Sequence, residues 1–266
     1  MSCRNVLMVR RRLLRDTSNP FMIGDETFRL EYRMYPWMAI ELFNGIAHAL
    51  PNHYAGVPAD LQFLSVVGFL ASGSYQKSCA NDQEHAMSQP TFSKYIHLVI
   101  PAVNSLRRRF IRFPRSREER QAVQIGFQEC LGFEGVYGAI DCTSIKIFTP
   151  SEDEAAYVDR ENNHSLNMQI ICDTNYRILA IRICNGRTHD QFIWLHSKIR
   201  DRLYRLLAEN PGERFCFIAD EGYTESRVLL IAVRNAINNS PEGEYSEAIR
   251  GTRCMVEQTI GMLKGT

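Results

Sequence analysis

The chain has 266 residues, of which 45% are hydrophobic and 23% are charged, and these values exclude general disorder, collagen and coiled-coil arrays. The length allows one substantial core, or one core with a small additional domain, and no apolar run approaches the ~18 residues that a membrane-spanning helix needs. The formal net charge of +1 neither requires nor excludes nucleic acid, because DNA would contact only one face of the protein.

Helical spacing of apolar residues predicts three main helices in the first hundred residues. The first lies within 31–50 and ends at the turn residues of 51–58. The second covers 61–70 and ends at Gly73, and the third begins at Ser88, which is expected to cap it. A short helix also fits within 75–86. The segment 58–100 is therefore either a helix-turn-helix with 88–100 as its recognition helix, or a group of short helices around a small core of their own.

Arginine is concentrated in the middle of the chain, between residues 107 and 120. Seven arginines in this stretch are accompanied by only two acids, Glu118 and Glu119. Such a run is usually a solvated charged face, but arginine also matches phosphate with two parallel hydrogen bonds, so contact with a nucleic-acid backbone is an equally good interpretation. The candidate nucleic-acid-binding residues are Arg107, Arg108, Arg109, Arg112 and Arg115.

After this stretch the pattern changes to short apolar runs that are typical of strands. Residues 136–140 form a buried strand with Asp141 at its tip, and 166–172 and 177–184 form a hairpin around the turn residues 173–176. A helix follows over 188–206, then a strand over 215–219 that is followed directly by Asp220. A fifth strand within 227–233 and a last helix over 245–263 complete a mixed sheet flanked by helices.

Two acids, Asp141 and Asp220, thus each follow an apolar strand, where α/β sheets commonly place ligand-binding side chains. Glu257 falls on the last helix, with Arg250 and Arg253 on the adjacent polar face, so that it can point towards the sheet. Carboxylates about 4 Å apart repel each other by on the order of 4 kcal/mol at an effective dielectric near 20. A divalent cation such as Mg²⁺ would remove this repulsion and could activate water for phosphodiester cleavage. For any one of these acids, a surface position or a helix cap is the simpler explanation.

The eight cysteines show no CxxC pair and no clustered histidine. They indicate neither a zinc module nor a disulfide framework. Several lie inside apolar runs, as is typical of buried thiols in a reducing compartment.

Five sequence blocks resemble, in order, those of PIF/Harbinger-type DDE transposases and the nucleases derived from them in animals. The blocks are GAIDCTSIKI (138–147), HSLNMQIICD (164–173), NGRTHD (185–190), ADEGY (219–223) and RCMVEQTIGMLK (253–264). The likeness extends upstream through GFLASGSYQ (68–76), MSQPTFSKYI (87–96) and FIRFP (110–114).

The resemblance implies a fold and a set of site residues. It implies a helical region over 1–120, with a helix-turn-helix-like unit at about 58–100, followed by a ribonuclease H-like DDE nuclease domain over 130–266. Asp141, Asp220 and Glu257 match the family's catalytic and metal-binding acids, and Asp190 is a fourth, assisting metal ligand. The implied activity is Mg²⁺- or Mn²⁺-dependent hydrolysis of phosphodiester bonds in DNA.

The resemblance also implies partners and a location. We expect a Myb/SANT-like DNA-binding partner and residence in the nucleus, with the cytoplasm as a second location, and a homo-oligomer stays open. The chain departs from the family pattern at Cys142 and Ser144, where GxIDGTHI is usual, and at ADEGY in place of GDSGY. Relatives also continue further beyond the position of Glu257, so we expect the last helix to lack part of its support.

Two alternatives to the nuclease remain. One is a derivative that kept the fold but lost cleavage and acts by binding DNA or a partner. The other is a poorly folding product of a decayed element.

Overall fold

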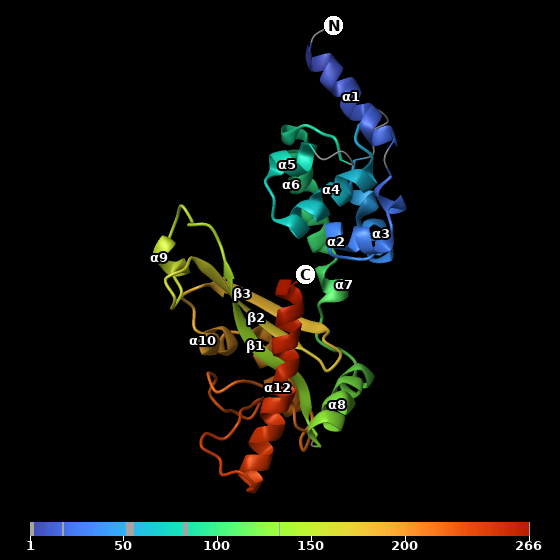
Figure 1. The fold of residues 1–266 in the computed structure, drawn as a ribbon. Helices are drawn as coiled ribbons and strands as arrows, with labels where there is room; N and C mark the ends of the chain where they lie inside the picture. The colour runs from blue at the N-terminus through green and yellow to red at the C-terminus, as the bar shows by residue number, and fades with distance from the viewer. Residues whose placement is uncertain (1–2, 18, 52–55, 82–84, 133, 266) are drawn as a thin grey trace. The chain divides into compact units, whose positions relative to one another are not determined.

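The structure, a computed structural model, describes residues 3–17, 19–51, 56–81, 85–132 and 134–265. The chain divides into two compact units, Met1–Arg109 and Phe110–Gly265 (Figure 1). The second unit includes helix α8 (Arg117–Leu131), whose Phe127 and Leu131 pack in the same core as Val136 of strand β1 (Val136–Lys146). The compact unit therefore starts earlier in the chain than the domain start at residue 130 that the sequence suggested.

The first unit is helical and is built around one hydrophobic core. Within that core, α4 contributes an almost continuous run of buried side chains, including Phe63, Leu64 and Val66, and it packs against α2, α5 and α6. The elements of the unit are α1 (Cys3–Thr17), η1 (Pro20–Met22), α2 (Asp25–Tyr32), α3 (Pro36–Ile46), η2 (Ala47–Ala49), α4 (Ala59–Ser72), α5 (Gln76–Asn81), α6 (Gln89–Ser105) and the start of α7 (Arg107–Phe110).

Local signals account for most of these helix ends. Gly73 ends α4 in the left-handed conformation, with a φ of 61°, and Ser88 caps α6 by accepting a hydrogen bond from the Thr91 amide. The helix predicted within 31–50 is confirmed as α3, which continues into η2 before the turn residues, whereas the residues just before it belong to α2. Arg33 ends α2 with a φ of 57°, and Pro36 begins α3 because proline cannot donate within a helix but fits its first turn. The helices α4, α5 and α6 share one core, and DNA recognition by 88–100 stays a prediction.

The second unit holds a mixed five-stranded sheet in the order β3-β2-β1-β4-β5. Strand β1 pairs antiparallel with β2 and parallel with β4, and β2 and β3 form the predicted hairpin. The α/β fold class, a mixed sheet flanked by helices with a helical region before it, is confirmed. Its elements are β1, α8, α9 (Glu154–Tyr157), β2 (Ser165–Cys172), β3 (Ile178–Asn185), α10 (Asp190–Leu195), α11 (Lys198–Glu209), β4 (Cys216–Ile218), β5 (Leu229–Leu230) and α12 (Pro241–Gly265).

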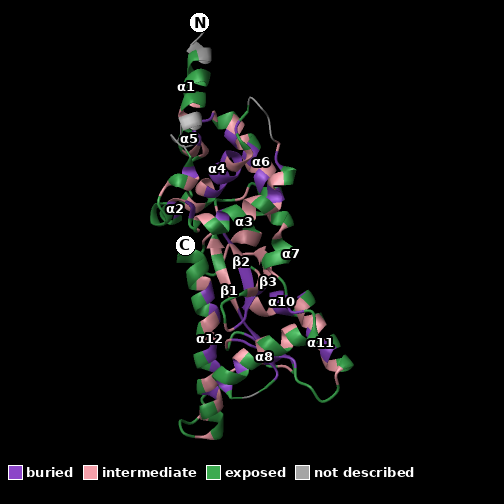
Figure 2. Ribbon diagram, turned by 90° about the vertical axis from the view of Figure 1, so that its right-hand side faces the viewer, coloured by how far each residue is buried: buried purple, intermediate pink, exposed green. Residues whose placement is uncertain are grey.

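Helices cover both faces of this sheet. On one face, Ala139 and Ile218 pack with Ile249 and Val256 of α12, and α8 joins the same core. On the other face, Ile140 and Phe217 pack in a core with Trp194 of α10 and with α11. Figure 2 shows buried residues concentrated in the strands between these helices. Along α12, burial continues as far as Thr259, whereas Met262 and Leu263 in its last turns are exposed.

Three predicted boundaries in this unit are corrected. Strand β1 does not end before Asp141, because its pairing with β2 continues from Ala139 to Lys146, and Asp141 lies opposite Ile170 inside the ladder. The helix predicted over 188–206 is broken after Leu195, where Ser197 caps a separate helix α11 by accepting a hydrogen bond from the Ile199 amide. Strand β5 is only two residues long.

Two further findings concern the thiols and the helices as a group. The seven cysteines that the structure describes are free thiols, and Cys172 and Cys216 are the buried ones among them. None of the described helices has the length and apolar character that crossing a bilayer requires.

We predict that Phe217→Ala destabilises the second unit by about 3–5 kcal/mol, because Phe217 is fully buried and contacts the rings of both Phe113 and Trp194. Urea unfolding followed by Trp194 fluorescence in a Trp37→Phe background would report on this unit alone. The matched control is Phe148→Ala, since the Phe148 side chain is 98% exposed and its loss should change stability by less than about 0.5 kcal/mol. Equal effects of the two substitutions would contradict the assignment of this core.

Candidate active site

The strand register brings Asp141 and Asp220 together. In the parallel pairing of β1 with β4, Ala139 lies opposite Ile218, and each acid lies two residues further along its own strand direction. Since side chains two residues apart share a face of a sheet, both carboxylates continue the face on which Ala139 and Ile218 pack against α12. The two acids therefore face the helix that carries Glu257.

Asp141 is half-buried, and its environment disfavours the charged form. Its Oδ1 accepts a hydrogen bond from the Cys142 amide at 2.7 Å. Burial is the largest influence on the pKa of Asp141 and, with the negative charges of Asp220 and Asp190, raises it to about 6. The amide hydrogen bond and the positive charge of Arg253 act in the opposite direction. Asp220 and Asp190 are thus close enough to Asp141 for their charges to affect its pKa.

Asp220 is held in the turn that follows β4. Its Oδ1 accepts a hydrogen bond from the Gly222 amide at 3.0 Å. A Cβ atom on Gly222 would lie 3.1 Å from the same oxygen, so the glycine permits this close approach of the backbone. The carboxylate is therefore fixed by its own turn, next to Asp141.

Glu257 lies across from these acids on α12 and lines a cavity of about 260 Å³ together with Asp220. Its carboxylate is bound by the guanidinium of Arg253, one turn earlier on the same helix. Glu257 is thus exposed beside Asp220, and its charge is neutralised by a neighbour that the sequence placed only on the adjacent polar face.

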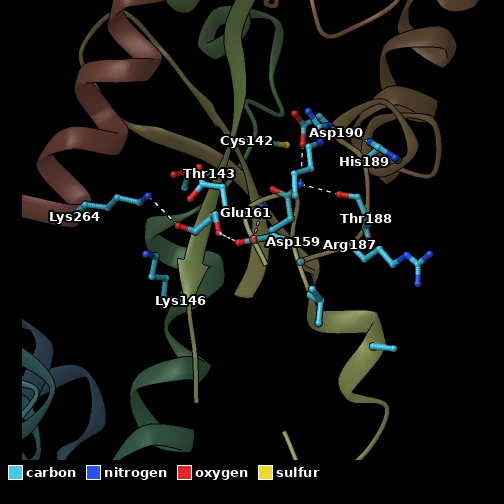
Figure 3. Close-up of a pocket in the computed structure, with 16 residues that line it drawn as sticks. Cys142, Thr143, Lys146, Asp159, Glu161, Arg187, Thr188, His189, Asp190 and Lys264 are labelled. Carbon is cyan, nitrogen blue, oxygen red and sulfur yellow. Dashed lines mark hydrogen bonds between the residues drawn. The ribbon is translucent and has the colours of Figure 1, made fainter. Parts of the chain in front are cut away.

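Asp190 is the first residue of α10 and lies on the other side of β1. It accepts a hydrogen bond from Asn167 Nδ2 at 2.7 Å, and the same amide group donates to the Thr188 carbonyl at 2.8 Å (Figure 3). With Cys142 it lines a second cavity of about 700 Å³. Because Cys142 and Asp141 alternate along β1, Asp190 approaches the site from the face opposite to α12.

The four predicted acids thus gather around the middle of β1 without forming a closed ligand set. In the part of the chain that the structure describes, no group of three or more His, Cys, Asp or Glu side chains is arranged to hold a metal ion. Asp141 and Asp220 supply two adjacent carboxylates, and such hard oxygen donors fit Mg²⁺ or Mn²⁺. Glu257 does not join them here, because its carboxylate is paired with Arg253.

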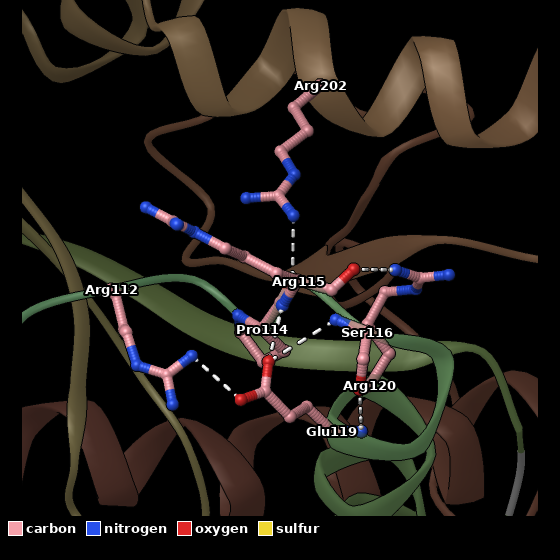
Figure 4. Close-up of polar contacts among 7 residues, drawn as sticks. All are labelled: Arg112, Pro114, Arg115, Ser116, Glu119, Arg120 and Arg202. Atoms are coloured by element: carbon pink, nitrogen blue, oxygen red, sulfur yellow. Dashed lines mark hydrogen bonds and ion pairs between the residues drawn. The ribbon is translucent and has the colours of Figure 1, made fainter.

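The predicted arginines have partners of their own. Arg109 forms an ion pair with Glu41 at 2.8 Å, whereas Arg107 and Arg108 lie exposed on α7. Arg112 pairs with Glu119 at 2.7 Å, and the same carboxylate accepts the backbone amide of Arg115 at 2.7 Å (Figure 4). These hydrogen bonds lower the pKa of Glu119 to about 2. They form part of the cap of α8, so this stretch has a structural role, and its contact with nucleic acid stays a prediction.

Sequence reasoning missed a buried polar cluster behind the acids. The hydroxyl of Tyr223 lies 3.2 Å from Cys142 Sγ and accepts a hydrogen bond from Gln169 Nε2 at 3.1 Å. The cluster links β1, β2 and the turn after β4, and Tyr223 is only 3% exposed. All three residues lie within the sequence blocks quoted above, but no local pattern indicates that they touch, because their contact depends on strand pairing.

Sequence comparisons identify relatives of the chain. Residues 140–266 match the family described as DDE superfamily endonuclease. The chain is 27% identical over 223 residues to "Putative nuclease HARBI1" of Xenopus laevis and 28% identical over 232 residues to the protein of the same name from Homo sapiens. These matches cover 83% and 87% of the chain but 62% and 64% of the relatives, so the chain spans less than two thirds of their length. No solved structure matches the chain. The resemblance drawn from the sequence motifs is confirmed.

We predict that Tyr223→Phe lowers the free energy of unfolding by about 1–3 kcal/mol, because it leaves the buried amide group of Gln169 without its hydroxyl acceptor. Tyr176→Phe is the matched control. The Tyr176 hydroxyl also makes a hydrogen bond, to Gln258 at 2.8 Å, but the residue is 43% exposed and water can replace the partner. Chemical unfolding of both variants would measure the difference. A Tyr223→Phe protein as stable as the control would show that the cluster does not support the site.

Proposed function

Because residues 140–266 carry a DDE superfamily endonuclease domain, we propose that this protein is a divalent-metal-dependent nuclease that hydrolyses phosphodiester bonds in DNA. The observation that supports the proposal is the pair Asp141 and Asp220, which lie two residues beyond the paired residues Ala139 and Ile218 and near enough for Asp220 to raise the pKa of Asp141. Two adjacent carboxylates facing a third on α12 form a centre of negative charge, and such a centre is stabilised by a cation.

Each acid has a distinct part in this proposal. Asp141 and Asp220 hold the cation through their carboxylate oxygens, and Glu257 joins them from α12. Asp190 assists from the opposite face, where Asn167 fixes the direction of its carboxylate. A bound Mg²⁺ or Mn²⁺ supplies a Lewis acid and lowers the pKa of water. The chain's contribution is to orient these oxygens and to hold the reacting strand beside them.

Arg253 has a second role in the proposal. Without a cation, its guanidinium compensates the negative charge of Glu257 and acts on Asp141 as well. Arg253 and a metal ion therefore compete for the same carboxylate. The ion pair of Arg253 with Glu257 also favours the alternative, a non-cleaving protein that binds DNA or a partner. If Arg253 stays bound to Glu257, the carboxylate cannot bind a cation and the ligand set stays incomplete.

A nuclear location, a Myb/SANT-like partner and assembly into a homo-oligomer remain proposals. They rest on the resemblance to Harbinger-type proteins. The names of the relatives state only a nuclease.

We predict that Asp141→Asn and Asp220→Asn each lower Mn²⁺-dependent nicking of supercoiled DNA by at least about 100-fold, since loss of even an outer partner can cost a metal site that much. Calorimetric titration with Mn²⁺ in the absence of DNA should show binding to the wild type and none to either variant. The control is Asp201→Asn, at an exposed carboxylate on α11, which should keep both properties. A folded wild type that binds no metal would overturn the nuclease and leave the non-cleaving alternative.

We predict that Arg253→Met tightens Mn²⁺ binding on the order of fivefold to tenfold, because it frees Glu257 and removes a nearby positive charge. Glu257→Gln should weaken binding instead. Arg205→Met, which removes an exposed arginine from α11, is the charge-matched control and should leave the affinity unchanged. Weaker metal binding by Arg253→Met would show that Arg253 positions Glu257 rather than competing for it.

A further inference from the structure

One edge of β1 is open beyond the acids. The pairing of β1 with β4 is described only as far as Ala139, whereas its pairing with β2 continues to Lys146. Along this far part of β1 the backbone makes contacts outside the sheet, since the Ser144 carbonyl accepts a hydrogen bond from Lys264 Nζ at 2.9 Å. The cavity of about 700 Å³ lies here, and Cys142, Thr143, Ser144 and Lys146 form part of its wall.

Four cationic side chains line this cavity, and they come from four separate segments. Lys146 ends β1, Arg160 follows α9, Arg187 follows β3 and Lys264 lies near the end of α12. All four are exposed. Among the residues that the structure describes, none of the four takes part in an ion pair. Their charges are therefore available to an anion.

The placement of the two lysines strengthens this point. Figure 3 shows Lys146 and Lys264 on the same side of the cavity, with their ammonium groups directed to the same region. Arg160 is oriented by a hydrogen bond that its Nη2 donates to His189 Nδ1, over 3.0 Å. Like charges brought close together repel, so such a group is stabilised when an anion lies between its members.

Three acids, Asp159, Glu161 and Asp190, line the same cavity, so that its four lysines and arginines leave a net charge of 4 − 3 = +1. Asp159 accepts hydrogen bonds from the amides of Glu161 and Asn163 and from the Ser144 hydroxyl, and these bonds lower its pKa. Asp159 therefore stays ionised, and these bonds hold its carboxylate against its own loop and β1. Glu161 is exposed, with Asn163 Nδ2 donating to it at 3.4 Å. Asp190 lies beside Cys142 in the wall of the cavity (Figure 3).

We propose that this groove binds the phosphodiester backbone of the DNA strand beside the bond to be cut. The inference rests on the proposed nuclease and names its backbone-binding residues as Lys146, Arg160, Arg187 and Lys264. Phosphates bound by the two lysines would direct the strand along the open edge of β1 towards Asp190 and Asp141. Of the arginines predicted from the sequence, Arg112 lies in the same unit as the groove but outside it, near the turn between β2 and β3, which adjoins the beginning of β1.

The test is DNA binding in EDTA, without metal, so that cleavage plays no part. The affinity of a fluorescein-labelled DNA duplex would be followed by anisotropy over a series of salt concentrations. The double variants are Lys146→Gln with Lys264→Gln, and Arg160→Gln with Arg187→Gln. Each lost phosphate contact reduces the slope of log affinity against log salt by about 1. We expect each double variant to reduce it by about 2.

The control is Arg177→Gln with Arg205→Gln, which removes the same charge from exposed positions outside the groove. It should leave the slope at the wild-type value, and Lys146→Arg with Lys264→Arg should keep it as well. Thermal unfolding would verify that each variant is folded. Equal slopes for the groove variants and the control would overturn the groove. Groove-dependent binding by a wild type that cuts no DNA would support the groove and refute the nuclease.

Discussion

The double pairing of β1 is the constraint on which the second unit depends. This strand forms an antiparallel ladder with β2 and a parallel ladder with β4, and its alternating side chains supply both cores. A shift of one residue in the register with β4 would turn Asp141 and Asp220 to opposite faces. The hydrophobic residues Ala139, Ile140, Phe217 and Ile218 disfavour such a shift, because it would move large and small side chains into the opposite core and disrupt the packing of both. The packing that stabilises the sheet therefore also fixes the position of the acids.

The electrostatic interactions among the acids follow from the same pairing of β1. The register brings Asp220 close to Asp141 in a half-buried setting, and burial with repulsion raises the pKa of Asp141. The guanidinium of Arg253 on α12 offsets part of this electrostatic repulsion. It binds Glu257 and attracts Asp141 as well. An arginine can leave such a position at small cost, since the Arg253 side chain is 32% exposed and can reach water. Arg253 thus compensates the negative charge of the acids without blocking Glu257 permanently.

Much of the second unit could be predicted from sequence, because apolar runs specify buried strands and the residues of 173–176 specify a turn. The segment 188–206 could not be divided from periodicity alone, since its apolar spacing continues through the break that Ser197 caps. The end of β1 was placed too early because the residues after Ile140 are polar, and polar side chains are compatible with a strand whose edge and faces open onto a cavity. The acids were recognisable from their sequence blocks, but the hydrogen bond of Asn167 to Asp190 and the cluster around Tyr223 depend on tertiary contacts.

The cationic groove shows why local charge density is a poor guide to a binding surface. The seven arginines of 107–120 form the most basic stretch of the sequence, yet Arg109 and Arg112 are paired with acids. The four groove cations are isolated in sequence and carry no local signal, but β1, α12 and two loops bring them to one cavity. In the groove, none of the four cations takes part in an ion pair among the described residues, and a cleft lined by an excess of one charge concentrates its field on a ligand of the opposite sign. For this reason the groove beside the acids, rather than the basic stretch of 107–120, is the surface that we propose for a phosphodiester strand.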